Sequence, residues 1–180
     1  STIRGGQTGV FTRKYESAKD GGAMFDLDCN SLYATVMLKY SYPCHDWKEE
    51  EIPDIEDLLP FIKTLHDSGR SAFFEIDMVV PENEEYSDYI PVASKRLIRG
   101  VYNYEAMRYY ESEDPDTMFF QGLTQVVGEH SHYCCHSRNL EWYLQRQIIK
   151  ISKIWFILSG KDEAVFRDYV QNNLDKRKQF

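Results

Sequence analysis

The run Ala72–Val80 (AFFEIDMVV) limits the fold of this chain more strongly than any other stretch of the sequence. It is rich in β-branched and aromatic residues and is closed by Pro81, a pattern typical of a β-strand. A second β-rich run, residues 148–156, alternates in the same way, and Gly160 is expected to break it. These two runs predict a sheet.

Helical segments are expected around these strands, over residues 32–38, 58–66, 102–110, 137–147 and 162–178. Asn30 or Ser31 would cap the first of them and Ser137 or Asn139 the fourth, because short polar side chains satisfy free backbone amides. A short strand is expected over residues 23–28. The mixture of strands and helices predicts an α+β fold.

The net charge of −8 is unevenly distributed. Residues 1–39 hold five Lys/Arg and four Asp/Glu, a net +1, and residues 135–180 hold nine against five, a net +4. Residues 40–134 hold seven Lys/Arg against 20 Asp/Glu, a net −13. The middle segment should repel a phosphate backbone, whereas the ends are compatible with nucleic acid, so the chain is not a uniformly basic binder.

The cysteines Cys29, Cys44, Cys134 and Cys135 form no CxxC pair, and we interpret them as reduced thiols. Cys134 and Cys135 lie within a stretch of potential zinc ligands that also contains His130, His132 and His136. Alternate positions of a strand face opposite ways, so we do not expect zinc there. A small zinc-binding α+β module is nevertheless one alternative for the function.

Asp28 stands at the end of an expected strand and is followed at once by a turn and a helix. A carboxylate in that position can hold a divalent cation, while the Cys29 carbonyl and the following amides can hold a triphosphate. The simpler alternative is an aspartate that caps the helix.

The segment Asp28–Tyr33 (DCNSLY) resembles the first palm motif of family B DNA polymerases, Asp-x-x-Ser-Leu-Tyr-Pro. Ile3–Gly6 (IRGG) resembles the Tyr-x-Gly-Gly element that precedes this motif in the protein-primed branch. Residues 74–91, and the stretch from 132 to 178, are similar to later segments of the polymerases of Polinton-like elements and virophages. The matches are collinear over nearly the whole chain.

The resemblance implies roles for the matching residues. Asp28 would bind the catalytic Mg²⁺ (or Mn²⁺) ions, helped by the Cys29 carbonyl. The amides near Ser31 and Leu32 would hold the phosphates, and Tyr33 would pack under the sugar. The basic residues Arg177 or Lys178 would meet the incoming triphosphate, and the residues expected to contact DNA are Arg4, Gly5 and Gly6.

The resemblance also divides the chain. Residues 1–40 would lead into and contain the first palm motif, residues 41–157 would form the inserted terminal-protein region, and residues 158–180 would form a basic-ended helix that leads toward the fingers. Ile3 stands where relatives often have Tyr, and Ala34 replaces Pro, as in the adenovirus-like branch. The chain ends before a second palm carboxylate, so we expect it to incorporate no nucleotide by itself.

Further basic residues could line a nucleic-acid groove with Tyr143 and Trp155, namely Lys95, Arg96, Arg99, Arg146, Lys150 and Lys153. The alternative is a solvated basic face over buried aromatic residues. The carboxylates Glu75 and Asp77 lie two residues apart on a strand, and we expect both on its solvent-exposed face.

The sequence therefore predicts a fragment of a protein-primed DNA-directed DNA polymerase from a virus or mobile element. The partners of the whole enzyme would be the terminal protein primer, the DNA template and primer, and dNTP. The isolated chain would be an interaction module whose acidic segment docks on a basic protein surface. The alternative is a stand-alone, catalytically inactive polymerase-derived binding or regulatory protein. A reading frame that continues past Phe180 into the second and third palm motifs would exclude it.

The sequence contains no apolar stretch long enough for a membrane-spanning helix, and residues 1–6 do not resemble a signal peptide or a natural start. We expect an excised or processed piece of an intracellular protein without a membrane partner, located in the cytoplasm or nucleus of a host cell or in a bacterial cytoplasm.

Overall fold

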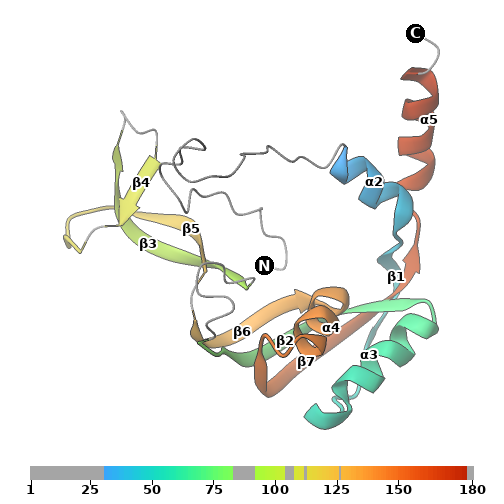
Figure 1. The fold of residues 1–180 in the computed structure, drawn as a ribbon, viewed down its shortest axis with the longest axis horizontal. Helices are drawn as coiled ribbons and strands as arrows, with labels where there is room; N and C mark the ends of the chain where they lie inside the picture. Colours follow the sequence, from blue (N-terminus) through green and yellow to red (C-terminus); the bar gives the residue numbers. More distant parts are fainter. Residues whose placement is uncertain (1–30, 83–91, 104–107, 112, 126, 178–180) are drawn as a thin grey trace, which may run out of the picture.

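A four-stranded antiparallel sheet, in the order β1-β7-β2-β6, forms the centre of the molecule (Figure 1). The computed structural model describes residues 31–82, 92–103, 108–111, 113–125 and 127–177. The strands of this sheet are β1 (Tyr42–Glu49), β2 (Arg70–Val80), β6 (Gly128–His136) and β7 (Lys150–Glu163). The α+β class predicted from the sequence is confirmed.

Two helices cover one face of this sheet (Figure 1). They are α3 (Leu58–Asp67), which follows the 3-10 turn η1 (Ile55–Asp57), and α4 (Ser137–Gln145), and both contact β2. Alternate residues of β2 point toward the helices, and Phe74, Ile76 and Met78 are almost completely buried. They form one hydrophobic core with Ile62 of α3 and Leu140 of α4. The period-two pattern of β2 thus separates a buried face from an open one.

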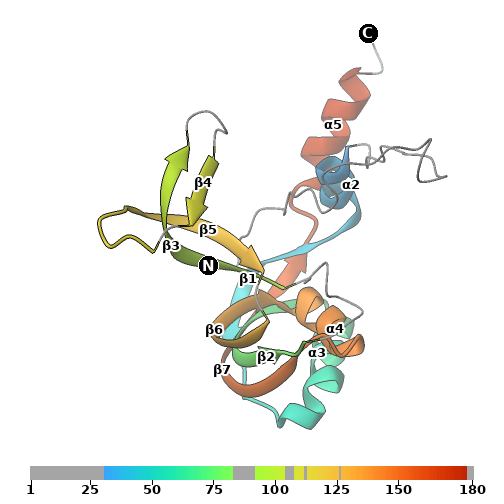
Figure 2. The same cartoon turned by 60° about the vertical axis from the view of Figure 1, so that its left-hand side comes forward.

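A second antiparallel sheet, in the order β4-β3-β5, projects from the first (Figures 1 and 2). Its strands are β3 (Ala93–Asn103), β4 (Arg108–Glu111) and β5 (Phe119–Gln125). The first residues of β3 attach it to β6. Ser94 Oγ lies 2.9 Å from His130 Nδ1, and the Tyr133 hydroxyl donates to the Ala93 carbonyl at 3.1 Å.

The helices α2 (Leu32–Lys39) and α5 (Arg167–Arg177) pack on each other beside the sheet, where β1 begins and β7 ends (Figure 1). Arg167 Nε donates to the Leu38 carbonyl at 3.1 Å, and the rings of Tyr42 and Phe166 meet edge to face. No side chain of α2 is buried, and only Val170 of α5 is. The apolar side chains of α2 are therefore not buried in the hydrophobic core of the sheet.

Five of the expected elements are confirmed over most of their length, namely residues 32–38, 58–66, 72–80, 137–147 and 148–156, which correspond to α2, α3, β2, α4 and β7. The helix expected over residues 162–178 begins later, at Arg167, because residues 162 and 163 still belong to β7. The domain boundary expected after residue 157 falls inside β7, which pairs with β2 on both sides of that point. The strand expected over residues 23–28 lies outside the described residues.

The helix expected over residues 102–110 is wrong. β3 continues to Asn103 and β4 begins at Arg108, with Val101 opposite Tyr110 and Tyr102 opposite Tyr109. β-branched and aromatic residues fit a pleated surface well, and the cross-strand pairing outweighs any helical pattern here.

Gly160 does not break β7, which continues to Glu163. A Cβ atom at Gly160 would lie 2.9 Å from the ring of Trp47 on the neighbouring strand β1. The glycine therefore allows the Trp47 ring to lie directly on β7, a close approach that any side chain would prevent.

No strand is expected from the sequence over residues 42–49, where β1 forms. β1 lies at the edge of the sheet, contains Pro43, and pairs with β7 through two register shifts. Asp46 has a positive φ of 50°. Proline and irregular pairing are tolerated at a sheet edge, so this strand lacks a regular sequence signal.

The expected helix caps are also corrected. Ser31 occupies the N-cap position of α2 but makes no side-chain cap hydrogen bond. The N-cap of α4 is His136 rather than Ser137 or Asn139, and His136 Nδ1 accepts a hydrogen bond from the Arg138 backbone amide at 3.2 Å.

We expect Ile62→Ala to lower the free energy of unfolding by about 2–5 kcal/mol, because it leaves a cavity in the core. Ile62 is completely buried, whereas Ile52 is 51% exposed. Ile52→Ala removes the same atoms and should cost less than about 1 kcal/mol. Urea unfolding followed by circular dichroism measures both values, and equal losses would contradict this assignment of the core.

Candidate interaction surface on the sheet

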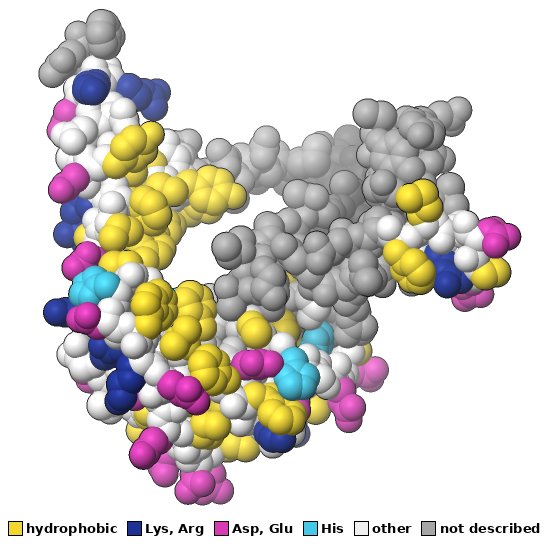
Figure 3. All heavy atoms as spheres, turned by 180° about the vertical axis from the view of Figure 1, so that it is seen from behind, with side chains coloured by type: hydrophobic (Ala, Val, Ile, Leu, Met, Phe, Trp, Pro, Cys, Tyr) yellow, Lys and Arg dark blue, Asp and Glu magenta, His cyan; other side chains and the backbone are white. Residues whose placement is uncertain are grey.

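The face of the four-stranded sheet opposite α3 and α4 is not covered by these helices, and we call it the open face. Residues at odd-numbered positions 73 to 79 of β2 point to it and are partly exposed. Seen from this side, hydrophobic side chains gather over the sheet and continue toward α2 and α5, with acidic side chains among them (Figure 3). The open face is defined by Trp47, Phe73, Glu75, Asp77, His132, Lys153 and Trp155.

Two aromatic rings form a flat platform at one end of the open face. Trp47 of β1 stacks on Phe73 of β2, with ring centroids 6.2 Å apart and an angle of 23° between the planes. The Trp47 side chain reaches over Gly160 of the intervening strand β7 and is still 46% exposed. A large aromatic surface is therefore held in place and accessible.

A second aromatic stack lies farther along the same face. The His132 and Trp155 rings are 4.6 Å apart at an angle of 22°, and Lys153 Nζ lies 3.1 Å from the centre of the Trp155 ring. His132 and Trp155 belong to β6 and β7, which flank β2 on opposite sides. The two rings therefore meet across the central strand.

Register shifts explain how these two rings reach each other. The pairing of β6 with β2 shifts between Ile76 and Met78, where His132 has a φ of 50°. The pairing of β7 with β2 shifts between Glu75 and Ile76, where Trp155 is the extra residue. β-bulges re-aim side chains in this way and are frequent beside functional sites.

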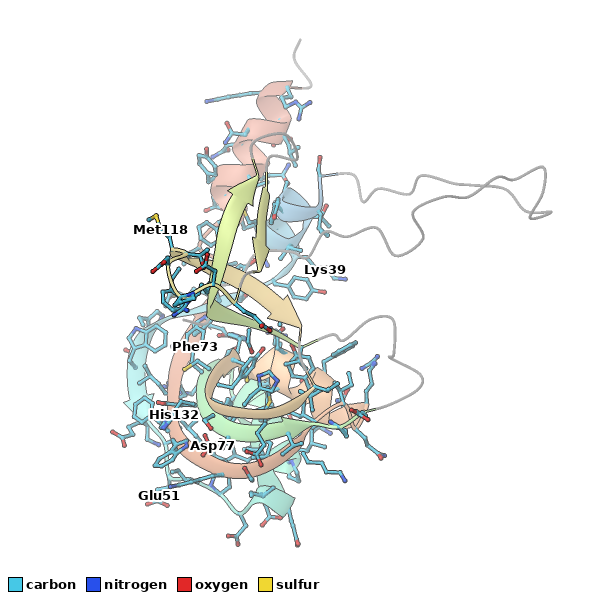
Figure 4. The ribbon with its side chains drawn as sticks, turned by 90° about the vertical axis from the view of Figure 1, so that its left-hand side faces the viewer. Lys39, Glu51, Phe73, Asp77, Met118 and His132 are labelled. Atoms are coloured by element: carbon cyan, nitrogen blue, oxygen red, sulfur yellow. The ribbon has the colours of Figure 1, made fainter. Side chains whose placement is uncertain are left out.

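The carboxylates Glu75 and Asp77 lie beneath and beside this stack. His132 Nδ1 lies 2.7 Å from Glu75 Oε1, and the His132 backbone amide donates to Asp77 Oδ1 at 2.8 Å. This hydrogen bond and one from the Trp155 side chain lower the pKa of Asp77 below its usual value. Phe73, Asp77 and His132 share one side of the sheet (Figure 4), so ionised carboxylate and aromatic rings are presented together.

The basic residues expected to line one nucleic-acid groove do not lie together. Two of them contact different tryptophan rings. Lys153 lies on Trp155, as described, whereas the Arg146 guanidinium lies 4.7 Å from the ring centre of Trp142 in α4. Tyr143 is only 7% exposed within the core, so it cannot stack on bases. Lys150 is the exposed first residue of β7.

Several residues expected at a polymerase site lie outside the described part of the chain: Asp28, Cys29, Arg4, Gly5, Gly6 and Lys178. Ser31, Leu32 and Tyr33 stand at the start of α2, and Arg177 lies in the last turn of α5, which packs on α2. Leu32 and Tyr33 are 53% and 81% exposed, so both side chains are accessible.

The five possible zinc ligands of residues 130–136 do not converge. His130 and Cys135 face the core, whereas His132 lies on the open face and His136 caps α4. Cys134 pairs with Glu75 in the register, on the opposite face of β6 from Cys135. Alternation along the strand separates Cys134 from Cys135, and the register shift at His132 separates this histidine from His130.

A Ser–His–Glu arrangement that the sequence analysis missed lies between α3 and α4. Ser137 Oγ is 2.9 Å from His66 Nε2, and His66 Nδ1 is 3.4 Å from Glu141 Oε2. Ser137 is completely buried and its Oγ accepts the Ala72 amide at 3.2 Å, so a substrate cannot reach it. His66 and Ser137 are 71 residues apart and form no motif, and the group ties two helices to the sheet rather than forming a hydrolytic site.

Comparison with protein-family models, curated proteins and solved structures finds no match for this chain. None of the helices in the described ranges combines the length and the apolar character needed to cross a membrane.

His136 should make the stability depend on pH. Burial first, and then the Arg138 charge, lower the pKa of His136 from 6.5 to about 4, and its Nδ1 can accept the Arg138 amide only when unprotonated. The unfolded chain binds this proton more readily than the folded chain. The contribution of His136 to the free energy of unfolding is therefore complete above pH 6.5 and is lost as the pH falls to about 4. The total loss is roughly 3 kcal/mol.

Chemical denaturation at a series of pH values measures this dependence. His136→Asn keeps a capping side chain without the titrating ring and should flatten the profile between pH 6.5 and about 4 relative to the unmodified protein. His132→Asn, at a positive φ that asparagine tolerates, should retain it. An identical profile for His136→Asn and the unmodified protein would contradict this role.

Proposed function

We propose that this chain is part of a protein-primed family B DNA polymerase and that its open face binds a basic protein, the terminal protein primer. The observation that carries the binding role is the open face itself, on which the exposed Trp47 and Trp155 side chains share one side of the sheet with Glu75 and Asp77. Rigid aromatic side chains are preferred anchors of protein interfaces, and carboxylates orient and accelerate docking of a basic partner.

The charge around this face supports a basic protein over nucleic acid. Residues 40–134, which include β1, β2 and most of β6, hold 20 Asp/Glu against seven Lys/Arg. Lys153 is placed on the Trp155 ring, next to the two carboxylates of β2, rather than in a basic stripe. A phosphate backbone would be repelled by this field, whereas a lysine- or arginine-rich surface would be attracted to it.

The motif at residues 28–33 supports the polymerase assignment. In the whole enzyme a primer hydroxyl would attack the α-phosphate of the dNTP and release pyrophosphate, and Mg²⁺ held by Asp28 and the Cys29 carbonyl would stabilise the developing charge. The described residues that would serve the nucleotide are Ser31, Leu32 and Tyr33 at the start of α2 and Arg177 on the adjacent helix α5.

A second candidate is a catalytically inactive, polymerase-derived binding protein. The same open face supports it, because the face requires no catalytic metal. The two candidates differ in whether the protein that contains this chain transfers nucleotides, so one experiment addresses binding and a second addresses catalysis.

The binding role predicts that a lysine-rich peptide quenches the tryptophan fluorescence of the chain more strongly than a glutamate-rich peptide or single-stranded DNA of equal length. Trp155→Ala should weaken this binding by about tenfold or more, since truncating a central aromatic anchor costs more than about 1 kcal/mol. The double variant Glu75→Gln, Asp77→Asn should also weaken it and reduce its dependence on salt.

Trp142→Phe is the control, because Trp142 is similarly exposed but lies on α4, on the opposite side of the sheet. It should bind the peptide as the unmodified chain does. Preferential binding of single-stranded DNA, or peptide binding that is insensitive to both salt and Trp155→Ala, would overturn the proposal.

The catalytic assignment predicts that Asp28→Asn in the full-length protein abolishes metal-dependent transfer of labelled dNMP to the primer protein. Peptide binding by the open face should be unchanged in that variant, because the binding role is assigned to the aromatic and acidic side chains of β1, β2 and β7. Retained transfer in Asp28→Asn would exclude the assigned role of the carboxylate, and absence of transfer in the unmodified full-length protein would favour the second candidate.

A further inference from the structure

Three side chains with metal-binding atoms come together where β1 begins and β7 ends. Cys44, His45 and Glu163 each offer one ligand atom, and these atoms lie within 4.8 Å of one another. Glu163 Oε2 is 3.7 Å from Cys44 Sγ, and Glu163 Oε1 is 2.6 Å from His45 Nε2. In a tetrahedral zinc site neighbouring ligand atoms are about 3.3–3.7 Å apart, so small side-chain movements would suffice.

The irregular pairing of β1 creates this arrangement. Consecutive residues of a regular strand point to opposite faces, so Cys44 and His45 would normally diverge. Here the pairing with β7 shifts between Pro43 and His45, and both side chains reach Glu163 of β7. The bulge thus converts an adjacent Cys-His pair into two converging ligands.

The second nitrogen of the histidine provides an independent observation. His45 Nδ1 lies 3.2 Å from Asp46 Oδ2, while Nε2 faces Glu163. A cation at Nε2 would leave Nδ1–H free to donate to Asp46, which is the carboxylate–histidine–metal arrangement that orients zinc ligands.

The surroundings favour a divalent cation. The carboxylates of Glu163 and Asp46 lie beside Cys44 and His45. A metal ion bound there would take the place of the thiol proton, and its positive charge would compensate the two carboxylates and the thiolate.

We propose that Cys44 Sγ, His45 Nε2 and Glu163 bind a zinc ion, with Asp46 hydrogen-bonded to the histidine from behind. On binding, the Cys44 thiol releases its proton to solvent and the thiolate coordinates the metal. Sulfur and imidazole ligands select zinc over Mg²⁺ or Ca²⁺. Three protein ligands leave a fourth position for water or a ligand from a partner.

This site is separate from residues 130–136 and does not rest on the proposed polymerase function. The metal would join β1 to the end of β7, just before α5, and so would fasten the α2–α5 pair to the sheet. Zinc binding should therefore stabilise the folded chain in proportion to its concentration.

The test uses the whole chain, stripped of metal and titrated with Zn²⁺ alone and with Co²⁺ alone. We expect one equivalent of zinc to bind and raise the thermal midpoint, and the cobalt form to show the near-ultraviolet charge-transfer absorption of a thiolate ligand. Cys44→Ser should abolish that absorption, and both Cys44→Ser and Glu163→Gln should weaken zinc binding by more than about tenfold. Asp46→Asn should weaken zinc binding by about tenfold and keep the absorption.

Cys134→Ser is the matched control, because it removes another partly exposed thiol and should change neither signal. Circular dichroism establishes that each variant is folded, and Glu163→Gln tests the site without altering a cysteine. Absence of stoichiometric zinc binding, charge-transfer absorption that persists in Cys44→Ser, or absorption lost in Cys134→Ser instead would each overturn the proposal.

Discussion

The pairing of β2 on both of its edges is the constraint on which the rest of the molecule depends. β2 lies between β6 and β7, and its alternating side chains fill the core on one side and form the open face on the other. The helices α3 and α4 bury the apolar side, with Ile62 and Leu140 against Phe74 and Ile76. Because the side-chain period of a strand is two, burying one face of β2 determines which residues the other face presents.

Departures from regular pairing produce both candidate sites. On the open face, register shifts in β6 and β7 bring His132 and Trp155 together across β2, and Asp77 holds the His132 amide. At the edge of the sheet, a shift in β1 turns Cys44 and His45 toward the same carboxylate. A regular ladder would separate each of these pairs, so the bulges are functional candidates rather than defects in the sheet.

Local pattern predicted much of the fold. The apolar period of residues 58–66 and the β-rich run 72–80 correspond to α3 and β2, because each pattern matches one buried face. The errors fall where a distant contact decides the structure. Gly160 continues a strand, and the Trp47 ring of the neighbouring strand lies on it. Residues 101–103 and 108–110 pair across two strands, with Val101 opposite Tyr110, instead of forming a helix.

The sequence by itself determined the α+β class, the central strand β2 and the solvent-exposed face of β2 on which Glu75 and Asp77 lie. These features follow from composition and from the alternation of apolar residues along the strand. Only the tertiary structure decided the register between strands far apart in the chain. That register stacks His132 on Trp155 and places Cys44 against Glu163, 119 residues away. A bulge shifts every later side chain of its strand relative to the neighbour, and its position depends on the packing of both strands, which no local pattern contains.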